Sequence, residues 1–402
     1  MSAPDAVTPA QLALPNFDDT QIAFQAKTDR ELKETYRLFQ LMNQKALVDI
    51  GSHLGKMAIK LRLPFVSTVI KQTIFKQFCG GVHLTDCQEV IDHLARYNAL
   101  TILDYGAEAK SEEAELNAAQ EELSRAIQFA ASNSSVPVVV SKLTALVDND
   151  LLKKRQTGET FTPKEEKQYA RFKQRIDVAC QEASELGVGV FIDAEESWIQ
   201  ESMDEVVTEL MSKYNHDKVI VYNTYQLYRH DKLDQLRADF WKAQEGGYKL
   251  GAKLVRGAYM DKERARAEAL GYPSPIQATK EDTDRDFDEA VRFCLDHYET
   301  ISMCNASHNL ESVRMMAREI DRLAIPRDHE HLNFSQLQGM SDHLTFNLAQ
   351  AGYNVAKYVV YGPVKEVAEY LIRRAEENTS MTGGMSRELG LISHEMKRRG
   401  LL

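Results

Sequence analysis

The chain has 402 residues, 43% hydrophobic and 27% charged, which suits one large barrel or two to three smaller domains. A formal net charge of −11 argues against a nucleic-acid-binding protein, because such proteins need a basic surface. Five cysteines without a CxxC pair indicate neither a disulfide framework nor a zinc site, so we expect no metal.

The first 63 residues are interpreted as an N-terminal lead-in followed by a helical arm. Three prolines fall within residues 1–20, which suits a poorly ordered start. Thr28 and Glu31 then form a capping-box pattern, and apolar residues at helical spacing follow. Residues 28–62 are therefore predicted to form one or two amphipathic helices outside the main domain.

Residues 64–380 alternate between short apolar runs and helical sequence, which is typical of parallel α/β folds. The predicted strands are 75–79, 100–104, 137–141, 188–193, 218–222, 252–256, 302–306 and 332–336. Several are continuous apolar runs, as expected for strands covered on both faces. Eight such runs predict a (β/α)8 TIM barrel.

The helix after Thr162 has clear boundary signals. Thr162 and Glu165 form a capping box, Pro163 occupies the first helical position, and Gly187 suits the end. Residues 107–130 also indicate a helix, whereas 147–160 are interpreted as a polar surface insertion.

The segment 356–378 is a short apolar strand, a Gly362-Pro363 turn with proline in the first helical turn, and a helix. An apolar stripe and a polar stripe of this helix lie about 100° apart. The arginines Arg373 and Arg374 therefore border the buried face, where two guanidinium groups suit a small carboxylate. The alternative is a solvated face with an Arg373–Glu377 ion pair.

Residues 381–402 are predicted to be a C-terminal helical tail that ends in three basic residues, Lys397, Arg398 and Arg399. We expect a packing helix, and the alternative is contact with an anionic membrane surface. No apolar run reaches the roughly 20 residues of a membrane span, and the N-terminus lacks the features of a targeting peptide. The expected location is cytoplasmic, with peripheral contact at the inner face of the membrane as an option.

Polar residues follow the apolar strands at several points, and in a barrel the carboxyl ends of the strands carry the active site. These residues are Lys142, Asp193, Glu195, Glu196, Asn223, Lys253, Arg256, Ser307, His308 and Asn309. A single polar residue at a strand end is as often structural as functional, but the repetition favours a site.

The stretch from Tyr370 to Asn378, with two arginines followed by Glu377, resembles the signature helix of the proline dehydrogenases. These flavin enzymes oxidise L-proline to 1-pyrroline-5-carboxylate. Segments 140–146, 191–196, 253–259, 306–309 and 334–340 are similar to the third, fourth, sixth, seventh and eighth strand motifs of the same family. The resemblance covers roughly residues 70–380. It implies a distorted barrel with the last helix across its mouth.

The resemblance also implies roles for individual residues. Arg373 and Arg374 would bind the proline carboxylate, Lys142 would lie near carboxylate and flavin, and Asp193 would hold the arginines in place. The proline ring would be enclosed by Tyr259, Leu337, Tyr358 and Tyr370. Contacts with FAD would come from Asn223, Lys253, Val255, Gly257, Thr279, Lys280, Ser307, His308, Asn309 and Glu377.

Three positions depart from the family pattern. Val360 stands where many relatives have proline, and Lys253 and Asn223 replace the arginine and glutamine of the bifunctional bacterial branch. The family resemblance implies a quinone as electron acceptor, and hydroxyproline remains an alternative substrate. Two other classes also stay open: a Schiff-base lyase or aldolase that uses Lys142 or Lys253, and a scaffold protein with a degenerate site.

Overall fold

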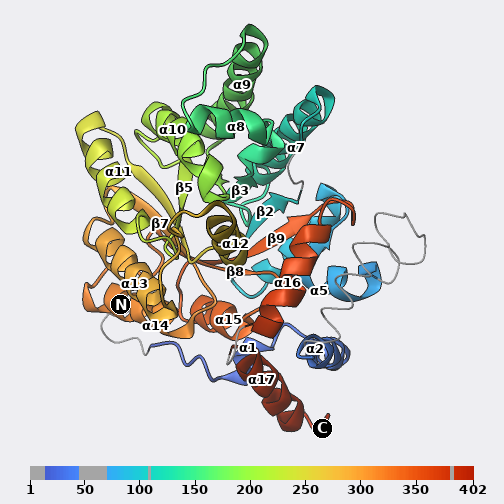
Figure 1. The fold of residues 1–402 in the computed structure, drawn as a ribbon. Coiled ribbons are helices and arrows are strands. Elements are labelled where there is room, and N and C mark those ends of the chain that lie inside the picture. The colour runs from blue at the N-terminus through green and yellow to red at the C-terminus, as the bar shows by residue number, and fades with distance from the viewer. Residues whose placement is uncertain (1–13, 45–69, 107–109, 381–383) are drawn as a thin grey trace. The chain divides into compact units, whose positions relative to one another are not determined.

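The computed structural model describes residues 14–44, 70–106, 110–380 and 384–402 (Figure 1). The fold is α/β, with a closed barrel of eight parallel strands, as the sequence predicts. The order in the sheet is β1-β9-β2-β3-β4-β5-β6-β7-β8, and β9 also pairs with β8. The ring therefore runs from β2 to β9, and the short β1 pairs with β9 as an addition to it.

The strands have the following bounds: β1 Cys79–Gly81, β2 Leu100–Tyr105, β3 Val138–Ser141, β4 Gly189–Ile192, β5 Val221–Gln226, β6 Leu250–Val255, β7 Ile301–Ala306, β8 Leu332–Leu337 and β9 Val355–Tyr361. Two strand predictions were wrong. Residues 75–78 are helical, in η2 (Lys71–Phe75) and α5 (Lys76–Phe78), so the ring takes its eighth strand from β9. The strand predicted at 218–222 begins at Val221 and continues to Gln226.

The described chain falls into two compact units. Unit 1 is built mainly from Glu108–Ser307 and Glu311–Ser335. Its strands pair in parallel from β3 through β7 to β8, for example Thr224 with Lys253 and Ala252 with Met303. Nearly every residue of β4, β5 and β6 is buried, which explains why β4 is apolar on both faces. The buried strands β5 and β6 also carry the polar residues Asn223, Thr224, Gln226 and Lys253.

Helices cover the strands of unit 1 (Figure 1). They are α7 Glu113–Ala131, η4 Leu143–Ala145, α8 Asn149–Gln156, α9 Pro163–Leu186, α10 Ser197–Tyr214, α11 Lys232–Gly246, α12 Met260–Leu270, α13 Lys280–Asp296 and α14 Leu310–Arg322. The capping box of Thr162, the first-turn Pro163 and a left-handed Gly187 after α9 are all confirmed. The predicted polar insertion contains the helix α8, whose Leu151 and Leu152 are buried.

Unit 2 consists of Pro15–Ala107, His308–Leu310 and Gln336–Leu402. Strand β9 pairs in parallel with β2, from Leu100 opposite Ala356 to Tyr105 opposite Tyr361, and with β1. The helices are α1 Thr20–Ala23, α2 Asp29–Met42, η2, α5, η3 Leu84–Cys87, α6 Gln88–Ala95, α15 Asp342–Gln350, α16 Ala368–Ser380 and α17 Gly384–Arg398. The capping box that starts α2 is confirmed. The rest of the predicted arm, 45–63, lies outside the described residues.

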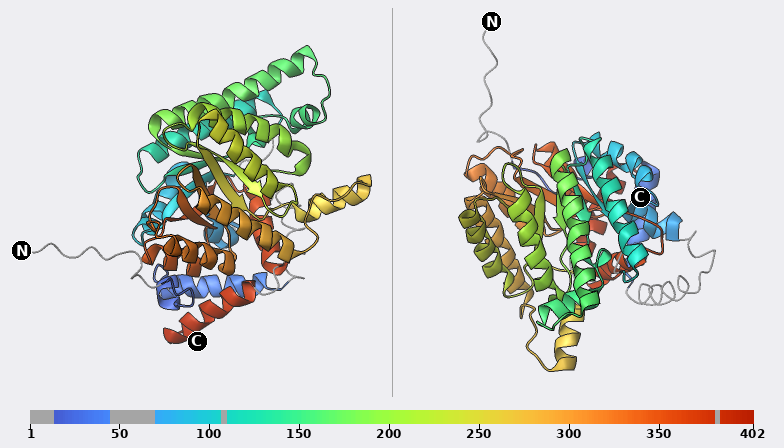
Figure 2. Two further views of the ribbon diagram at one scale, coloured as in Figure 1. Left: turned by 90° about the vertical axis from the view of Figure 1, so that its left-hand side faces the viewer. Right: turned by 90° about the horizontal axis from the view of Figure 1, so that it is seen from above.

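The C-terminal helix α17 lies beside α1 and α2 within unit 2 (Figure 2). The buried carboxylate of Glu395 accepts a hydrogen bond from Thr20 at 3.0 Å, and Arg399 donates to the carbonyl oxygens of Phe24 and Lys27. Arg398 and Arg399 both pair with Glu395. Two of the three basic residues that suggested membrane contact therefore take part in packing the tail.

The signature segment differs from its prediction at one point. After β9 and Gly362-Pro363, residues 364–367 form a turn in which the N–H of Glu366 and of Val367 donate to the carbonyl oxygen of Pro363. Helix α16 begins only at Ala368. Pro363 therefore lies before the helix rather than in its first turn.

Candidate active site

Two lysines share one aspartate at the ends of strands β3, β4 and β6 in unit 1. Lys253 donates to Oδ1 of Asp193 at 2.5 Å, and the ammonium group of Lys142 lies 4.0 Å from Oδ2. These three side chains are at most 17% exposed, which strengthens the electrostatic interactions among them. The structure thus brings three predicted residues together, with two positive charges around one negative charge.

Tyr259, a predicted substrate contact, donates its hydroxyl to a buried carboxylate. The acceptor is Oε2 of Glu195 at 2.5 Å, and Oε1 of Glu195 accepts from the Thr144 hydroxyl at 3.0 Å. Burial raises the pKa of Glu195 to about 7, although these two hydrogen bonds act in the opposite direction. Glu195 was recognised from the sequence only as a polar residue at a strand end. The structure assigns it to the support of Tyr259.

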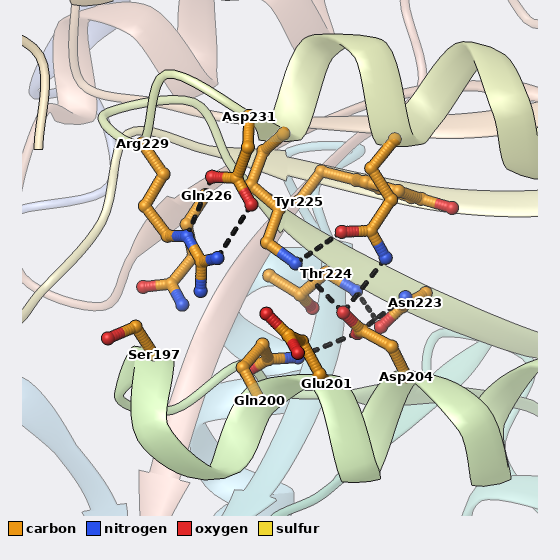
Figure 3. A network of polar contacts seen from close by, with 12 residues as sticks. Ser197, Gln200, Glu201, Asp204, Asn223, Thr224, Tyr225, Gln226, Arg229 and Asp231 are labelled. Atoms are coloured by element: carbon orange, nitrogen blue, oxygen red, sulfur yellow. Dashed lines mark hydrogen bonds and ion pairs between the residues drawn. The ribbon is translucent and has the colours of Figure 1, made fainter. Parts of the chain in front are cut away.

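Asn223 lies on the other face of β5 from the lysine–aspartate cluster. Thr224 pairs in register with Lys253, so their side chains share a face, and Asn223 points the opposite way. Its amide donates to Oδ1 of Asp204 on α10 at 3.0 Å, and its side-chain oxygen accepts from the backbone N–H of Thr224 (Figure 3). The side chain of Asn223 therefore points into the layer between the sheet and α10. Among the predicted flavin contacts on β5 and β6, Asn223 alone points this way.

Asp204 is the centre of that buried network (Figure 3). Besides Asn223, its oxygens accept hydrogen bonds from Gln200, Lys232 and Gln235 at 2.8 to 2.9 Å. The side chain of Lys232 is 2% exposed, so the aspartate compensates a buried charge. This network stabilises the packing of α10 and α11 on β5.

Gln226, which ends β5, lies on the same face as Thr224 and Lys253 and was missed by the sequence analysis. Its amide donates to the carbonyl oxygen of Glu195 at 2.7 Å, while the N–H of Glu195 donates to Gln200. Gln226 thus fixes the backbone that carries the partner of Tyr259. The alternation of faces along β5 would have revealed it, but the predicted strand ended at 222.

A second cluster joins the ends of β6 and β7 to helix α13. Arg256 donates to Oδ1 of Asp284 at 2.7 Å and to the Ser307 hydroxyl at 2.7 Å, and its guanidinium group lies 4.4 Å from the ring centre of Phe287. Asp284 also pairs with Lys280. Ser307 and Lys280 are therefore connected through Arg256, which was noted at a strand end but given no role.

The remaining predicted residues of unit 1 frame this cluster. Thr279 caps α13 through a bond from the N–H of Asp282. Gly257 has a φ of 141°, and a Cβ there would lie 2.4 Å from the ring of Tyr228, so the position requires glycine. Val255 ends β6, and its carbonyl oxygen accepts from the N–H of Leu227.

His308, a predicted flavin contact, belongs to unit 2 and is neutral. Burial, followed by the positive charge of Arg374, lowers its pKa to about 3. Nδ1 lies 2.8 Å from the hydroxyl oxygen of Ser341, and the backbone N–H of Leu337 donates to Nε2 at 3.5 Å. The structure thus brings His308 and the predicted substrate residue Leu337 together. Asn309 follows directly and is half-buried.

Helix α16 presents the signature tyrosine and arginines. The guanidinium group of Arg374 lies 5.3 Å from the ring centre of Tyr370, whose hydroxyl donates to the carbonyl oxygen of Phe78 at 3.4 Å. Arg374 is only 5% exposed, and Arg373 is half-buried. These exposures argue against the solvated-face interpretation. Tyr358 is buried in β9. The side chain of Glu377 lies outside the described part of the chain.

The described residues hold no candidate metal site and no membrane-spanning helix. No group of three or more His, Cys, Asp or Glu side chains in that part could hold a metal ion, and the five cysteines are free, buried thiols. In the same ranges, no helix is both long and apolar enough to cross a membrane.

A comparison with models of protein families identifies the family of this chain. The model described as "Proline dehydrogenase" matches residues 87–387, about three quarters of the chain. The chain belongs to the proline dehydrogenase family. This membership confirms the resemblance.

Named relatives agree with the family. "Proline dehydrogenase 1, mitochondrial" of Homo sapiens is 40% identical over 271 residues, which cover 65% of this chain and 45% of that protein. The protein of the same name from Dictyostelium discoideum is 30% identical over 426 residues, which cover 95% and 74%. "Hydroxyproline dehydrogenase" of Xenopus laevis is 30% identical over 433 residues, which cover 98% and 92%. The chain spans less than half the length of the human and Drosophila melanogaster relatives.

Solved structures show the same fold. The crystal structure of proline utilization A (PutA) from Bdellovibrio bacteriovorus, inactivated by N-propargylglycine, superposes with a TM-score of 0.69. Identity is 22%, over 89% of this chain and 38% of that chain. PutA from Bradyrhizobium japonicum gives a TM-score of 0.65 over 96% of this chain.

Proline dehydrogenases are flavin-dependent, and the donor set of this chain fits a flavin. A reduced isoalloxazine carries negative charge, and Lys253 and Lys142 supply two ammonium groups of low solvent exposure at the ends of β6 and β3. Ser307 and Arg256 add a hydroxyl and a guanidinium group. The neutral His308 can present a hydrogen bond without adding a charge.

Proposed function

We propose that this chain oxidises L-proline to 1-pyrroline-5-carboxylate and that FAD is its cofactor. Within the family, the observation that carries the proposal is the cluster of Lys142, Asp193 and Lys253, which holds two ammonium groups around one carboxylate at the ends of β3, β4 and β6. Such fixed charges favour an anionic substrate and the negative charge that develops during reduction.

Substrate binding is assigned to the signature helix and its neighbours. Arg373 and Arg374 would bind the carboxylate through charge-assisted hydrogen bonds, for which planar guanidinium groups are well suited. Lys142 would add a third positive charge, and Asp193 would keep the cations in place. The ring would be enclosed by Tyr259, Leu337, Tyr358 and Tyr370.

The FAD contacts are proposed to come from Lys253, Val255, Gly257, Thr279, Lys280, Ser307, His308, Asn309 and Glu377. Asn223 was part of this set, but its amide is committed to Asp204. Gln226, on the face of Lys253, is the better candidate at the end of β5. The exposed position of Thr279 and Lys280 suits contact with a polar part of the cofactor.

FAD, when bound, would accept a hydride from the ring carbon beside the nitrogen. The protein contributes orientation and electrostatics, because the redox chemistry belongs to the cofactor. Hydride transfer requires the ring nitrogen to be deprotonated, because its lone pair forms the new C=N bond. Glu195 holds Tyr259 through its hydroxyl, so the tyrosine ring is fixed where it would limit the position of the substrate.

Hydroxyproline is the second candidate substrate. The relative from Xenopus laevis named hydroxyproline dehydrogenase matches 98% of this chain and 92% of its own length. A tyrosine at 358 matches relatives that prefer proline, which favours L-proline as the better substrate.

We further propose a quinone as the acceptor that reoxidises FAD, and a cytoplasmic location with peripheral contact at the inner face of the cell membrane. The family resemblance supports the quinone. The membrane contact has weak support, because Arg398 and Arg399 pair with Glu395 in the tail.

The test is a steady-state assay of the purified chain with L-proline and with hydroxyproline, using a soluble quinone as acceptor. We expect a protein-bound cofactor with the mass of FAD, turnover of L-proline, and a product that has lost two hydrogen atoms. Protein that cannot be loaded with FAD, or turnover of neither substrate, would refute the proposal. Higher kcat/KM for hydroxyproline would reverse the substrate assignment.

A further inference from the structure

The loop from β8 to α15 has an unusual backbone. Gly339 and Ser341 have φ angles of 78° and 53°. A left-handed conformation costs a residue with a side chain roughly 1 to 2 kcal/mol, and it persists where surrounding contacts impose it. The contacts of Ser341 therefore show what the loop is built to hold.

Two side chains fix the backbone just before Ser341. Gln77 donates to the carbonyl oxygen of Gly339 at 2.8 Å, and the buried ammonium group of Lys357 donates to that of Met340 at 2.5 Å. Lys357 also pairs with Asp342 at 2.8 Å, at the start of α15. The loop is therefore held on both sides of the strained residue.

The contact at Ser341 itself comes from the C-terminal helix. Its backbone N–H donates to Oε1 of Glu388 on α17 at 2.7 Å. Glu388 is 7% exposed, and burial raises its pKa to about 7. A buried carboxyl group is costly unless it has a specific partner, which here is the strained residue.

The hydroxyl of Ser341 does not cap the helix that follows it. Ser341 occupies the N-cap position of α15, where serine usually accepts a bond from the first turn, but no such bond is made. Its Oγ lies 2.8 Å from Nδ1 of His308 instead. The N–H of Leu337 points to Nε2 of His308 at 3.5 Å, which favours the neutral tautomer that carries its proton on Nδ1 and donates it to Ser341.

We propose that Glu388, on the C-terminal helix, is a positioning residue for the cofactor site. It holds Ser341 in the left-handed conformation, and Ser341 fixes the Nδ1–H tautomer and the ring orientation of His308. The proposal rests on the proposed role of His308 toward FAD. Under this proposal the C-terminal helix has a function beyond packing, because a substitution at Glu388, more than 40 positions along the chain from Ser341, would alter cofactor binding.

Variants of the full chain separate this role from simple support. In Glu388→Ala and Ser341→Ala we expect the dissociation constant for FAD to rise roughly tenfold, since each leaves a buried donor without its acceptor. Glu388→Gln keeps an acceptor oxygen, and we expect its FAD affinity to stay within about twofold of the wild type.

The matched control is Thr20→Val, which removes a different contact of α17, the bond to Glu395. We expect a lower unfolding temperature but an FAD affinity within about twofold of the wild type. An equal loss of FAD affinity in Thr20→Val and Glu388→Ala would overturn the specific role of Glu388. So would unchanged affinity in Glu388→Ala.

A second measurement does not depend on FAD. The 15N chemical shifts of the labelled apoprotein, with His308 assigned from a His308→Gln variant, report the tautomer directly. We expect Nδ1–H in the wild type and in Thr20→Val, and a mixture in Glu388→Ala. If His308 of the wild type carries its proton on Nε2, the inference is refuted. A wild type with the expected tautomer but no FAD binding would refute the proposed function, and with it the cofactor role of Glu388.

Discussion

The two units hold their candidate site residues in different ways. In unit 1, Lys142, Asp193 and Lys253 project from strand ends and pair with one another through charge. In unit 2, His308 depends on Ser341, which depends on Glu388 of the last helix. The first arrangement is local to a sheet, whereas the second needs a loop and a distant helix. Unit 1 should therefore tolerate changes that conserve charge, and unit 2 should be sensitive to changes in hydrogen-bond geometry.

The largest effect should come from the signature helix. Arg374→Met removes a guanidinium group that is almost fully buried, and we expect the KM for proline to rise roughly 100-fold, since a charge-assisted hydrogen bond contributes about 3 kcal/mol. Steady-state kinetics measures the change, and bound FAD should remain. Arg30→Met, at an exposed ion pair, is the control. An unchanged KM would return Arg374 to a structural role.

The expectation that unit 1 tolerates changes that conserve charge is tested at Lys253. Lys253→Met removes one of the two lysines that pair with Asp193 and leaves the pair with Lys142. We expect kcat/KM to fall roughly 30-fold, which lies within the range for the loss of a hydrogen bond to a charged group. Lys253→Arg keeps the charge and should retain most of the activity. Equal losses in both variants would show that geometry rather than charge matters there.

The pH dependence of stability should be weaker without Glu195. Its raised pKa means that the folded chain holds a proton between about pH 4.5 and 7 which the unfolded chain has lost. This stabilisation is complete below the unfolded pKa and is lost as the pH rises through 7. The measurement is urea unfolding at pH 5 and at pH 8. The fall in unfolding free energy between these two pH values should be smaller in Glu195→Gln than in the wild type by about 2 kcal/mol. An equal fall in the variant and the wild type would contradict the raised pKa of the buried Glu195 carboxyl group.

The smallest effect on cofactor binding is expected at Asn223. Asn223→Ala should lower the unfolding free energy by about 1 to 3 kcal/mol, because Asp204 loses a buried donor. Its FAD affinity should stay close to that of the wild type. Gln226→Ala is the comparison, and we expect it to weaken FAD binding. The reverse pattern would restore Asn223 to the site.

The barrel could be predicted because buried parallel strands are continuous apolar runs with polar residues at their ends. Lys142 and Asp193 followed from that rule, and so did the capping box and terminal glycine of α9. The rule failed at residues 75–78, where two phenylalanines around a polar pair belong to a helix, and at β5, where polar residues inside a buried strand ended the prediction too early. Gln226 was lost with that boundary.

The contacts of unit 2 were beyond sequence reasoning for a physical reason. Ser341 carries no local signal for a left-handed conformation, since serine normally avoids it. The partner Glu388 lies in a tail that was interpreted only through its basic end. Such long-range pairs depend on tertiary packing, whereas capping and periodicity depend on neighbours in the chain.

The most direct test of the account is an anaerobic titration of the FAD-loaded chain with L-proline, followed by the flavin absorbance. We predict complete bleaching in the wild type, and bleaching of Arg374→Met only at far higher proline concentrations. A wild-type spectrum that proline does not change would contradict the proposed function.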